Sequence, residues 1–574
     1  MGAFGQLRWV LRVTRTPLWN LLIISVASTV AGLSEAVALV LIIGLVTGTG
    51  STGGTLATTL GLSDPSVVSI VVMGVVLVVL ALACNVVTSL LVARNAASGV
   101  DVVRREFSDA FVSATFARRE GFTPARSAEL MGLGAYQAES AILQGANVVI
   151  AAVSLLAYLG IAVVVDPLAA AATILLGLAM MILLRPVAKV AQRRMRAYVD
   201  RSAYALAWFG EVVELAVEAR SFGVEKPALA EFAARSSSAV RAGRRARFLL
   251  SLSPALYQTT ALVLVLLGVL IVTESGLIEP AALAVIAVLL VRALSLVQRL
   301  SLALQAVGAA LPLLEDVVLA TDDLRLEPQG RGSVVLDGAR VLSVRDVSFG
   351  YHEDRPVLKG LSFDVRVGEL VAVIGPSGGG KSTLFELLLR LRQPDEGVIH
   401  LDDVDLSDVA DESLRRLMTY VPQDSRLLRD TLHANTAFLR NVGLAEIHAA
   451  LLGAGLDATK GAPLPGALTN ATVSGGQRQR IGIARAIATK PSFVLLDEPT
   501  SGLDHANERM VRRTLKNLCK QSAVLLIAHR ASTVAMCDRV IVLQDGLLLD
   551  DGPSAQVLAR NTYLREMLAD DSQP

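Results

Sequence analysis

A glycine-rich loop between two hydrophobic segments places the strongest constraint on how this chain can fold. Residues 375–383 read Gly-Pro-Ser-Gly-Gly-Gly-Lys-Ser-Thr and fit the pattern G-x-x-x-x-G-K-[ST]. The apolar run 371–374 predicts a buried strand before the loop, and 384–391 predicts a helix after it. In such a unit, backbone N–H groups turn toward phosphate oxygens and the helix N-terminus adds positive potential. The expected phosphate-binding residues are Gly375, Pro376, Ser377, Gly378, Gly379, Gly380, Lys381, Ser382 and Thr383.

Two acidic residues follow a second predicted strand and add chemistry to this loop. The apolar run 493–496 leads directly into Asp497 and Glu498. Asp497 can hold the Mg²⁺ shell, as the second acidic element of phosphate-loop ATPases does, together with the Ser382 hydroxyl. We expect Lys381 to reach the β- and γ-phosphates and Glu498 to polarise the attacking water as a general base.

Two further polar residues end predicted strands. Gln423 follows Val421-Pro422 and exposes an amide, and His529 follows the apolar run 524–528. Ligands of open α/β sheets bind at the carboxyl ends of the strands. We therefore expect His529 to lie on the same side of the sheet as the two acids.

An aromatic residue and a helix start complete the set of candidates. Tyr351 lies about thirty residues before the loop, where it is either a surface for stacking a purine or an ordinary strand aromatic. Ser474, Gly475, Gly476 and Gln477 open a predicted helix that runs to about residue 488. The free N–H groups of that helix start and the Ser474 hydroxyl form a second candidate anion site.

Composition implies a membrane domain ahead of this site. Of 574 residues, 53% are hydrophobic and only 18% are charged, which is unusual for a soluble protein of this size. The net charge of +1 argues against a nucleic-acid partner. The three cysteines, Cys84, Cys519 and Cys537, have no metal-ligand spacing and are expected to be buried or incidental thiols.

The first 320 residues are organised as membrane-spanning segments. Residues 1–17 carry Arg8, Arg12 and Arg15 on one helical face, which predicts an amphipathic helix on the cytoplasmic surface of a membrane. Six apolar stretches fit spanning helices, near 18–47, 66–93, 141–165, 168–188, 249–273 and 281–304. The connections 48–64, 165–167 and 274–280 contain no Lys or Arg, whereas 94–140 and 185–248 are basic. This pattern places both termini in the cytoplasm of a multi-pass protein of the cell (inner or cytoplasmic) membrane, in contact with its lipid.

The two long internal connections are predicted to extend the membrane helices into the cytoplasm. They contain helical apolar spacing and reverse direction near 116–122 and 222–230. Residues 321–338 are polar, contain proline and glycines, and read as a linker. From residue 339 to 574, short β-like runs give way to alternating strands and helices. The predicted fold is thus a six-helix all-α transmembrane domain at 18–320, followed by an α/β phosphate-loop ATPase domain with an antiparallel β lobe.

In combination, these motifs give a specific resemblance. The phosphate loop, Gln423, Ser474-Gly475-Gly476-Gln477, Asp497-Glu498 and His529 resemble a bacterial ABC transporter half of the exporter type over the whole chain. The resemblance implies that Tyr351 stacks adenine, that Gln423 senses Mg²⁺ and couples to the membrane domain, and that His529 contacts the γ-phosphate. It also implies that Ser474 completes the ATP site of an opposing second half-transporter, so that two ATP molecules lie in a dimer interface. The segment 501–504 resembles the family's dimer-contacting loop, and the turns at 116–122 and 222–230 resemble its coupling helices.

Two departures from the family pattern are visible. Val473 and Gly502 replace the usual leucine and alanine, changes that leave the chemistry intact. The stretch 464–473 is short and contains no acid where exporters usually carry a Gly- and Glu-containing segment. This difference concerns the coupling between domains and not ATP binding.

The resemblance implies an ATPase that exports or flips an amphiphilic substrate, a small molecule or a peptide. An importer of a siderophore-like substrate on the same fold and a nucleotide-gated channel or regulator stay open as alternatives, as does the choice between homodimer and heterodimer. Two ionisable residues lie inside predicted spans, Glu35 in the first and Arg292 in the sixth. Charges there are costly and usually face a cavity or a partner, so both are candidate residues of a substrate cavity, with a structural ion pair as the alternative.

Overall fold

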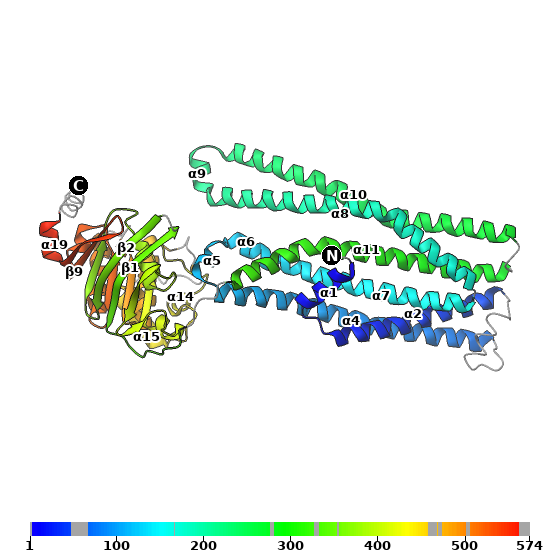
Figure 1. Ribbon diagram of the computed structural model, residues 1–574, viewed down its shortest axis with the longest axis horizontal. Helices are drawn as coiled ribbons and strands as arrows, with labels where there is room; N and C mark the ends of the chain where they lie inside the picture. Colours follow the sequence, from blue (N-terminus) through cyan, green and yellow to red (C-terminus); the bar gives the residue numbers. More distant parts are fainter. Residues whose placement is uncertain are drawn as a thin grey trace. The chain divides into compact units, whose positions relative to one another are not determined.

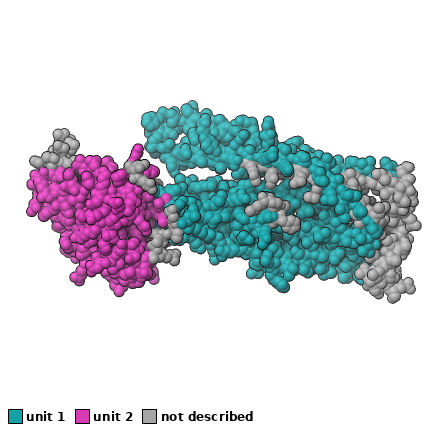
Figure 2. Space-filling model, in the orientation of Figure 1, with its two compact units in different colours: residues 1–114, 118–327 teal, residues 115–117, 328–574 magenta. Residues whose placement is uncertain are grey.

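The computed structural model describes residues 3–47, 67–165, 167–275, 280–326, 332–352, 355–456, 468, 473–500 and 505–561. The chain divides into two compact units, which are coloured separately in Figure 2. Unit 1 comprises Met1–Ala114 and Arg118–Glu327, and unit 2 comprises Thr115–Ala117 and Pro328–Pro574.

Long helices build unit 1 (Figure 1). They are α1 (Ala3–Val13), α2 (Leu18–Thr47), α4 (Val67–Ser113), α5 (Phe116–Glu120), α6 (Pro124–Glu129), a π-helical turn η1 (Leu130–Gly134), α7 (Ala135–Val165), α8 (Pro167–Glu214), α9 (Ala216–Ser221), α10 (Glu225–Ser275) and α11 (Pro280–Arg325). Each of the six predicted spans falls on one of the long helices among these. In the described residues, four segments are both long and apolar enough to cross a membrane: Leu18–Ile42, Val67–Ser113, Pro124–Val164 and Leu290–Arg325. The helical N-terminal architecture is confirmed, and the count of six spans stays a prediction.

Small residues allow the helices of unit 1 to pack closely. A Cβ atom added at Gly32 of α2 would lie 3.3 Å from the Cα of Ser154 on α7. One added at Gly99 of α4 would lie 2.2 Å from Cδ1 of Ile142 on α7. Close approach of this kind is how helices associate where solvent offers no hydrophobic driving force. Val10 of α1 is fully buried against the same group of helices.

The two chain reversals of unit 1 lie slightly differently from their predicted positions. The helix α5 falls within the predicted turn at 116–122. In the second connection, α8 ends at Glu214, the short helix α9 follows, and the chain reverses at 222–224. The prediction of a turn extending to residue 230 was wrong, because Pro227 lies in the first turn of α10, where a missing N–H is tolerated.

The predicted linker also begins too early. The helix α11 continues through Thr321 to Arg325, and Thr321 donates a hydrogen bond to the Val317 carbonyl. Polar composition alone could not distinguish a solvent-exposed helix end from a linker. The connections 48–64 and 276–279, together with Asp166, lie outside the described residues, and so do 501–504 and most of 464–473.

Two sheets form the framework of unit 2. A six-stranded sheet has the spatial order β10 (Leu547–Pro553), β9 (Arg539–Gln544), β3 (Leu370–Ile374), β8 (Ala523–Ile527), β7 (Phe493–Asp497), β6 (Met418–Val421), with β10 antiparallel to β9 and the other pairs parallel. An antiparallel sheet has the order β2 (Arg355–Arg366), β1 (Val341–His352), β4 (Glu396–Leu401), β5 (Val404–Asp405). The α/β domain with an antiparallel lobe is confirmed.

The central strands are apolar on both faces because each face packs into a core. In β3, alternate residues belong to two separate hydrophobic clusters, Val371 and Val373 to one and Ala372 and Ile374 to the other. A parallel strand covered on both sides is expected to be a continuous hydrophobic run. The surrounding helices are α12 (Lys381–Leu388), α13 (Asp411–Leu417), α14 (Leu432–Ala437), α15 (Leu444–Gly453), α16 (Gly475–Thr489), α17 (His505–Cys519), α18 (Ala531–Val534) and α19 (Ser554–Arg560).

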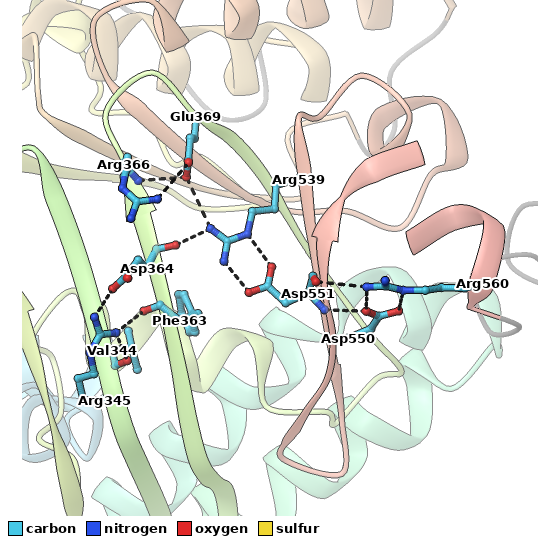
Figure 3. Close-up of polar contacts among 10 residues, drawn as sticks. All are labelled: Val344, Arg345, Phe363, Asp364, Arg366, Glu369, Arg539, Asp550, Asp551 and Arg560. Carbon is cyan, nitrogen blue, oxygen red and sulfur yellow. Dashed lines mark hydrogen bonds and ion pairs between the residues drawn. The ribbon is translucent and has the colours of Figure 1, made fainter. Parts of the chain in front are cut away.

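A charged cluster joins the two sheets (Figure 3). Arg539 on β9 binds both carboxylate oxygens of Asp551 on β10, with Nε–Oδ1 and Nη2–Oδ2 distances of 2.6 and 2.5 Å. Its Nη1 donates to the backbone carbonyl of Asp364 on β2 at 2.7 Å. A bidentate arginine is held in a fixed geometry. Since β9 flanks β3, this contact fixes the antiparallel lobe beside the strand that leads into the phosphate loop.

Candidate active site

The phosphate loop connects β3 to α12 and closes around the Lys381 side chain. Gly375 has φ +154°, and a Cβ atom there would lie 1.9 Å from the Leu543 carbonyl oxygen, so only glycine fits. Gly380 caps α12 with φ +93°, a backbone conformation that side chains disfavour. Lys381 Nζ donates to the carbonyl oxygens of Gly375 and Pro376, both at 2.9 Å. The loop therefore joins a buried strand to a helix, as the motif predicts.

Lys381 is buried, and burial disfavours the positive charge of its ammonium group. Only 7% of the residue is exposed, and this burial lowers the pKa of its ammonium group. The negative charges of Glu498 and Asp497 act in the opposite direction and raise the pKa. A negatively charged phosphate in the loop would further favour the protonated form.

Glu498 lies just beyond β7 in a strained backbone conformation. Its φ is +46°, which is rare for a residue with a side chain and costs about 1–3 kcal/mol. Gln479 on α16 donates its Nε2 to the Glu498 carbonyl at 2.8 Å, and the Glu498 N–H bonds to the Ile527 carbonyl at 3.2 Å. Strain of this kind concentrates at functional sites, where neighbouring structure holds it in place.

The Glu498 carboxylate contacts Gln423 and also His529, the residue predicted to share its side of the sheet. Gln423 Nε2 donates to Oε2 at 2.9 Å, and His529 Nε2 lies 3.3 Å from Oε1. These residues follow β6, β7 and β8, which are neighbours in the sheet and parallel. The structure thus brings together Gln423, Glu498 and His529 at the carboxyl edge of the strands.

Asp497 occupies the last position of β7. Burial and the neighbouring Glu498 carboxylate raise the pKa of Asp497, while a hydrogen bond from the Tyr420 hydroxyl, at 3.3 Å, lowers it. Carboxylate, hydroxyl and amide oxygens are the ligands that Mg²⁺ prefers. The donor set of Asp497, Ser382 and Gln423 therefore fits the predicted metal.

Tyr351 already contacts several side chains of its own domain. Its hydroxyl lies 3.1 Å from Thr383 Oγ1 and donates to Glu386 Oε2 at 3.2 Å. The guanidinium of Arg392 lies 4.7 Å from the ring centroid, within cation–π range. Because 47% of Tyr351 is exposed, its ring is accessible to a purine, and the stacking role stays a prediction.

The helix start at Ser474 is fully capped within the chain. Ser474 Oγ accepts from the Gln477 N–H at 3.2 Å, and Gln477 Oε1 accepts from the Ser474 N–H at 3.0 Å. This is a capping box, in which two N–H groups are satisfied reciprocally. Both Ser474 and Gly475 are exposed, so this helix start is available to a ligand from outside the chain.

In unit 1, the two ionisable candidates line one cavity of about 420 Å³. Glu35 accepts hydrogen bonds from Asn85 Nδ2 and the Tyr158 hydroxyl, both at 3.4 Å. Arg292 contributes to the same wall without an ion pair to Glu35 in the described part of the chain. The geometry favours the cavity interpretation over a structural ion pair.

Known proteins are similar to unit 2 in sequence and to the whole chain in fold. The ABC transporter family model matches residues 358–501, which include the phosphate loop, Gln423, Ser474 and Glu498. A structure of a bacterial Atm1-family ABC exporter with ATP bound superposes with a TM-score of 0.80 at 23% identity, covering 98% of this chain and 99% of that chain. Residues 358–501 thus match the ABC transporter family, and the whole chain has the fold of that exporter. The apolar helices of unit 1 and the α/β domain of unit 2 belong to one polypeptide.

Curated relatives of this chain share a shorter region. An ATP-dependent lipid A-core flippase of Burkholderia orbicola is 39% identical over 250 residues, 42% of this chain and 42% of that protein. An ATM1-type heavy metal exporter of Novosphingobium aromaticivorans is 40% identical over 231 residues, 39% of this chain and 38% of that protein. The human ATP-binding cassette sub-family B member 6 is 37% identical over 245 residues, 42% of this chain and 29% of that protein. The similarity thus spans about two fifths or less of each relative's own length.

Sequence reasoning missed three residues that position the site. Tyr420 donates a hydrogen bond to Asp497, Gln479 donates one to the Glu498 carbonyl, and Arg392 lies over one face of the Tyr351 ring. Tyr420 lies in β6 opposite Leu495 of β7, a strand pairing that the sequence does not reveal. The other two contacts depend on how a helix and a loop pack, and no local pattern signals them.

Proposed function

We propose that this chain is one half of a dimeric ATP-driven transporter, which exports or flips an amphiphilic substrate, a small molecule or a peptide by alternating access. The observation that carries the proposal is the contact of Gln423 and His529 with the Glu498 carboxylate, close to the buried Lys381. A general base must be held in place beside the reacting phosphate. A channel or regulator that uses nucleotide only for gating needs no such base, so an intact, oriented Glu498 favours hydrolysis.

Each residue of the site has a proposed role in ATP hydrolysis. Lys381 Nζ would exchange its bonds to two loop carbonyls for oxygens of the β- and γ-phosphates. Glu498 would orient the attacking water and take its proton, while His529 contacts the γ-phosphate from the next strand. Mg²⁺, when bound through Ser382, Asp497 and Gln423, would neutralise charge that develops on the phosphate oxygens.

Exposed apolar side chains on the hairpin of α8, α9 and α10 support a protein partner. Val217 and Phe222, near the reversal, are 75% and 80% exposed. Further exposed apolar residues on α8 and α10 are Tyr204, Leu206, Phe209, Val213 and Leu229. Large exposed apolar side chains gathered on one element indicate an interaction surface. We assign this surface to a second half-transporter, whose ATP site the exposed Ser474 of this chain would complete.

The membrane setting rests on the apolar helices and on the charge pattern of the connections. We place the protein in the cell (inner or cytoplasmic) membrane with both termini in the cytoplasm. Relatives named as a lipid flippase and as a heavy metal exporter support outward transport. Import of a siderophore-like substrate is the alternative direction.

Transport in inside-out membrane vesicles tests this function. Vesicles containing the native chain are incubated with a cell metabolite extract and Mg-ATP, and their contents are compared by mass spectrometry with those of vesicles containing Lys381→Ala. An exporter concentrates at least one compound inside the vesicles only when ATP and Lys381 are present. ATP-dependent loss of a preloaded compound would instead support the importer, and no ATP-dependent change in either direction would contradict transport.

A further inference from the structure

The cavity of unit 1 has an unusually polar wall for a pocket within membrane helices. More than half of its lining residues are polar: Glu35, Asn85, Gln144, Asn147, Ser154, Tyr158, Arg292, Ser295 and Arg299. Its apolar residues are small or aliphatic, and Tyr158 is the only aromatic among the described lining residues. Pockets for hydrophobic small molecules are lined mainly by apolar and aromatic side chains. This wall is therefore better suited to a polar ligand than to a hydrophobic one.

Two arginines of the same helix dominate the charge of the cavity. Arg292 and Arg299 lie about two helical turns apart on α11, roughly 10 Å along the axis, and so share one face. Both side chains are exposed to the open space of the cavity. In the described part of the chain, neither guanidinium group makes a hydrogen bond or an ion pair. Each retains its full set of donors for a ligand.

The single carboxylate of the wall does not neutralise these arginines. Glu35 accepts its hydrogen bonds from Asn85 and the Tyr158 hydroxyl. Two guanidinium groups therefore face a single acidic side chain in the described lining of the cavity. An arginine within a membrane segment is costly unless water, a partner group or a ligand compensates it, and such residues mark substrate pathways.

The chemistry of the ligand follows from these donors. A guanidinium binds carboxylate and phosphate groups through paired N–H donors, which gives geometric as well as electrostatic selection. The amides of Asn85, Gln144 and Asn147 can bind further polar groups of the same molecule. A volume of about 420 Å³ falls within the range for a small-molecule site.

We propose that this cavity binds a small polar anion, bearing carboxylate or phosphate groups, through Arg292 and Arg299. This inference rests on the proposed transport function and narrows its substrate class. In the proposed orientation, α11 runs inward from Pro280, so Arg299 lies roughly 28 Å along the helix, near the cytoplasmic edge of a ~30 Å core. Arg292 lies roughly 18 Å along it, closer to the middle. An anion from the cytoplasmic side would meet Arg299 first and Arg292 second.

Calorimetric titration of the full chain tests the proposal, using nanodiscs of phosphatidylcholine without nucleotide. The probes are the tripeptides Glu-Glu-Glu and Lys-Lys-Lys. Triglutamate should bind the native protein more tightly than trilysine, and Arg292→Gln or Arg299→Gln should each weaken it by roughly 10- to 100-fold. Lysine at either position should recover part of the affinity. Arg94→Gln, an exposed arginine of α4 outside the cavity, should leave it unchanged.

A charge reversal provides the decisive variant. The doubly substituted protein Arg292→Glu, Arg299→Glu should bind trilysine in preference to triglutamate. The inference is overturned if native protein binds neither probe, binds both equally, or retains its triglutamate affinity in the arginine variants. Adding phosphatidylglycerol to the nanodiscs decides the source of the anion. If this lipid displaces triglutamate, the site binds a lipid headgroup; if triglutamate stays bound, the site binds a soluble anion. ATP hydrolysis by the native protein is measured in the same discs to separate ATP-driven transport from anion binding. Absence of hydrolysis would contradict the proposed transport function, whereas the titrations alone decide the anion site.

Discussion

The amide of Gln423 donates its Nε2 hydrogen to Oε2 of Glu498 over 2.9 Å, which joins the ends of two adjacent parallel strands. The other carboxylate oxygen faces His529 Nε2 at 3.3 Å. The two contacts fix the orientation of the carboxylate from opposite sides. Hydrogen bonds to a charged group are stronger than those between neutral groups, so this arrangement holds the proposed base in place.

Removing the Gln423 amide should change the Mg²⁺ dependence of the ATPase. The Gln423→Ala protein loses one proposed Mg²⁺ ligand and one hydrogen bond to Glu498. We expect half-saturation to need roughly 10-fold more Mg²⁺, a value typical of losing one polar contact to a charged group. Steady-state hydrolysis titrated with Mg²⁺ at saturating ATP gives this value. An unchanged midpoint would remove Gln423 from the metal site.

ATP binding should be linked to protonation of Lys381. Burial lowers its pKa in the ligand-free protein, and a bound phosphate, being negative, raises it again. Between the pKa of the free protein and that of the complex, binding takes up a proton, so ATP affinity falls as pH rises through this interval. Calorimetry in paired buffers of different ionisation enthalpy should detect this uptake.

The matched variant for that measurement is Lys381→Arg, whose guanidinium stays charged throughout the window and should show no such uptake. Lys381→Ala should weaken ATP binding by roughly 10- to 100-fold, since it removes a charge-assisted contact. Equal proton uptake by the native and arginine proteins would assign the linkage to another group.

The proposed dimer can be trapped through the exposed helix start at Ser474. Cysteines at positions 377 and 474, in a Glu498→Gln background with Cys84→Ser, should form a disulfide between protomers when ATP is present. Burial raises the pKa of Cys519 to about 11 and that of Cys537 to about 12, so these native thiols should stay unreactive at neutral pH. Non-reducing electrophoresis should show a species of twice the 60.5 kDa chain mass. If the protein binds ATP without cross-linking, a homodimer is excluded and a different half-transporter is the partner.

Much of unit 2 could be predicted because its signals are local. The phosphate loop requires glycine at Gly375 and Gly380, and the acids and His529 directly follow apolar strands. The contacts of Tyr420 and Gln479 could not be predicted, since they depend on the packing of neighbouring elements. The turn assigned to Pro227 failed because proline is compatible both with a reversal and with the first turn of a helix.

In unit 1, the helices could be predicted from the sequence, but the contacts between them could not. Apolar length predicted the segments, and Glu35 and Arg292 both fall inside predicted spans. Whether they pair depends on the rotation of each helix, which hydropathy does not encode. The structure places both on the wall of one cavity, with Glu35 bound to Asn85 and Tyr158.

Steady-state ATP hydrolysis by purified Glu498→Gln protein tests the central claim most directly. The substitution keeps the shape of the side chain and removes its capacity to accept a proton from water. We expect turnover to fall by ~10²–10⁴-fold, the usual contribution of one positioned general base, with ATP still bound at near-native affinity. A native rate of hydrolysis in this variant, in protein shown to bind ATP, would contradict the assignment of Glu498 as the base.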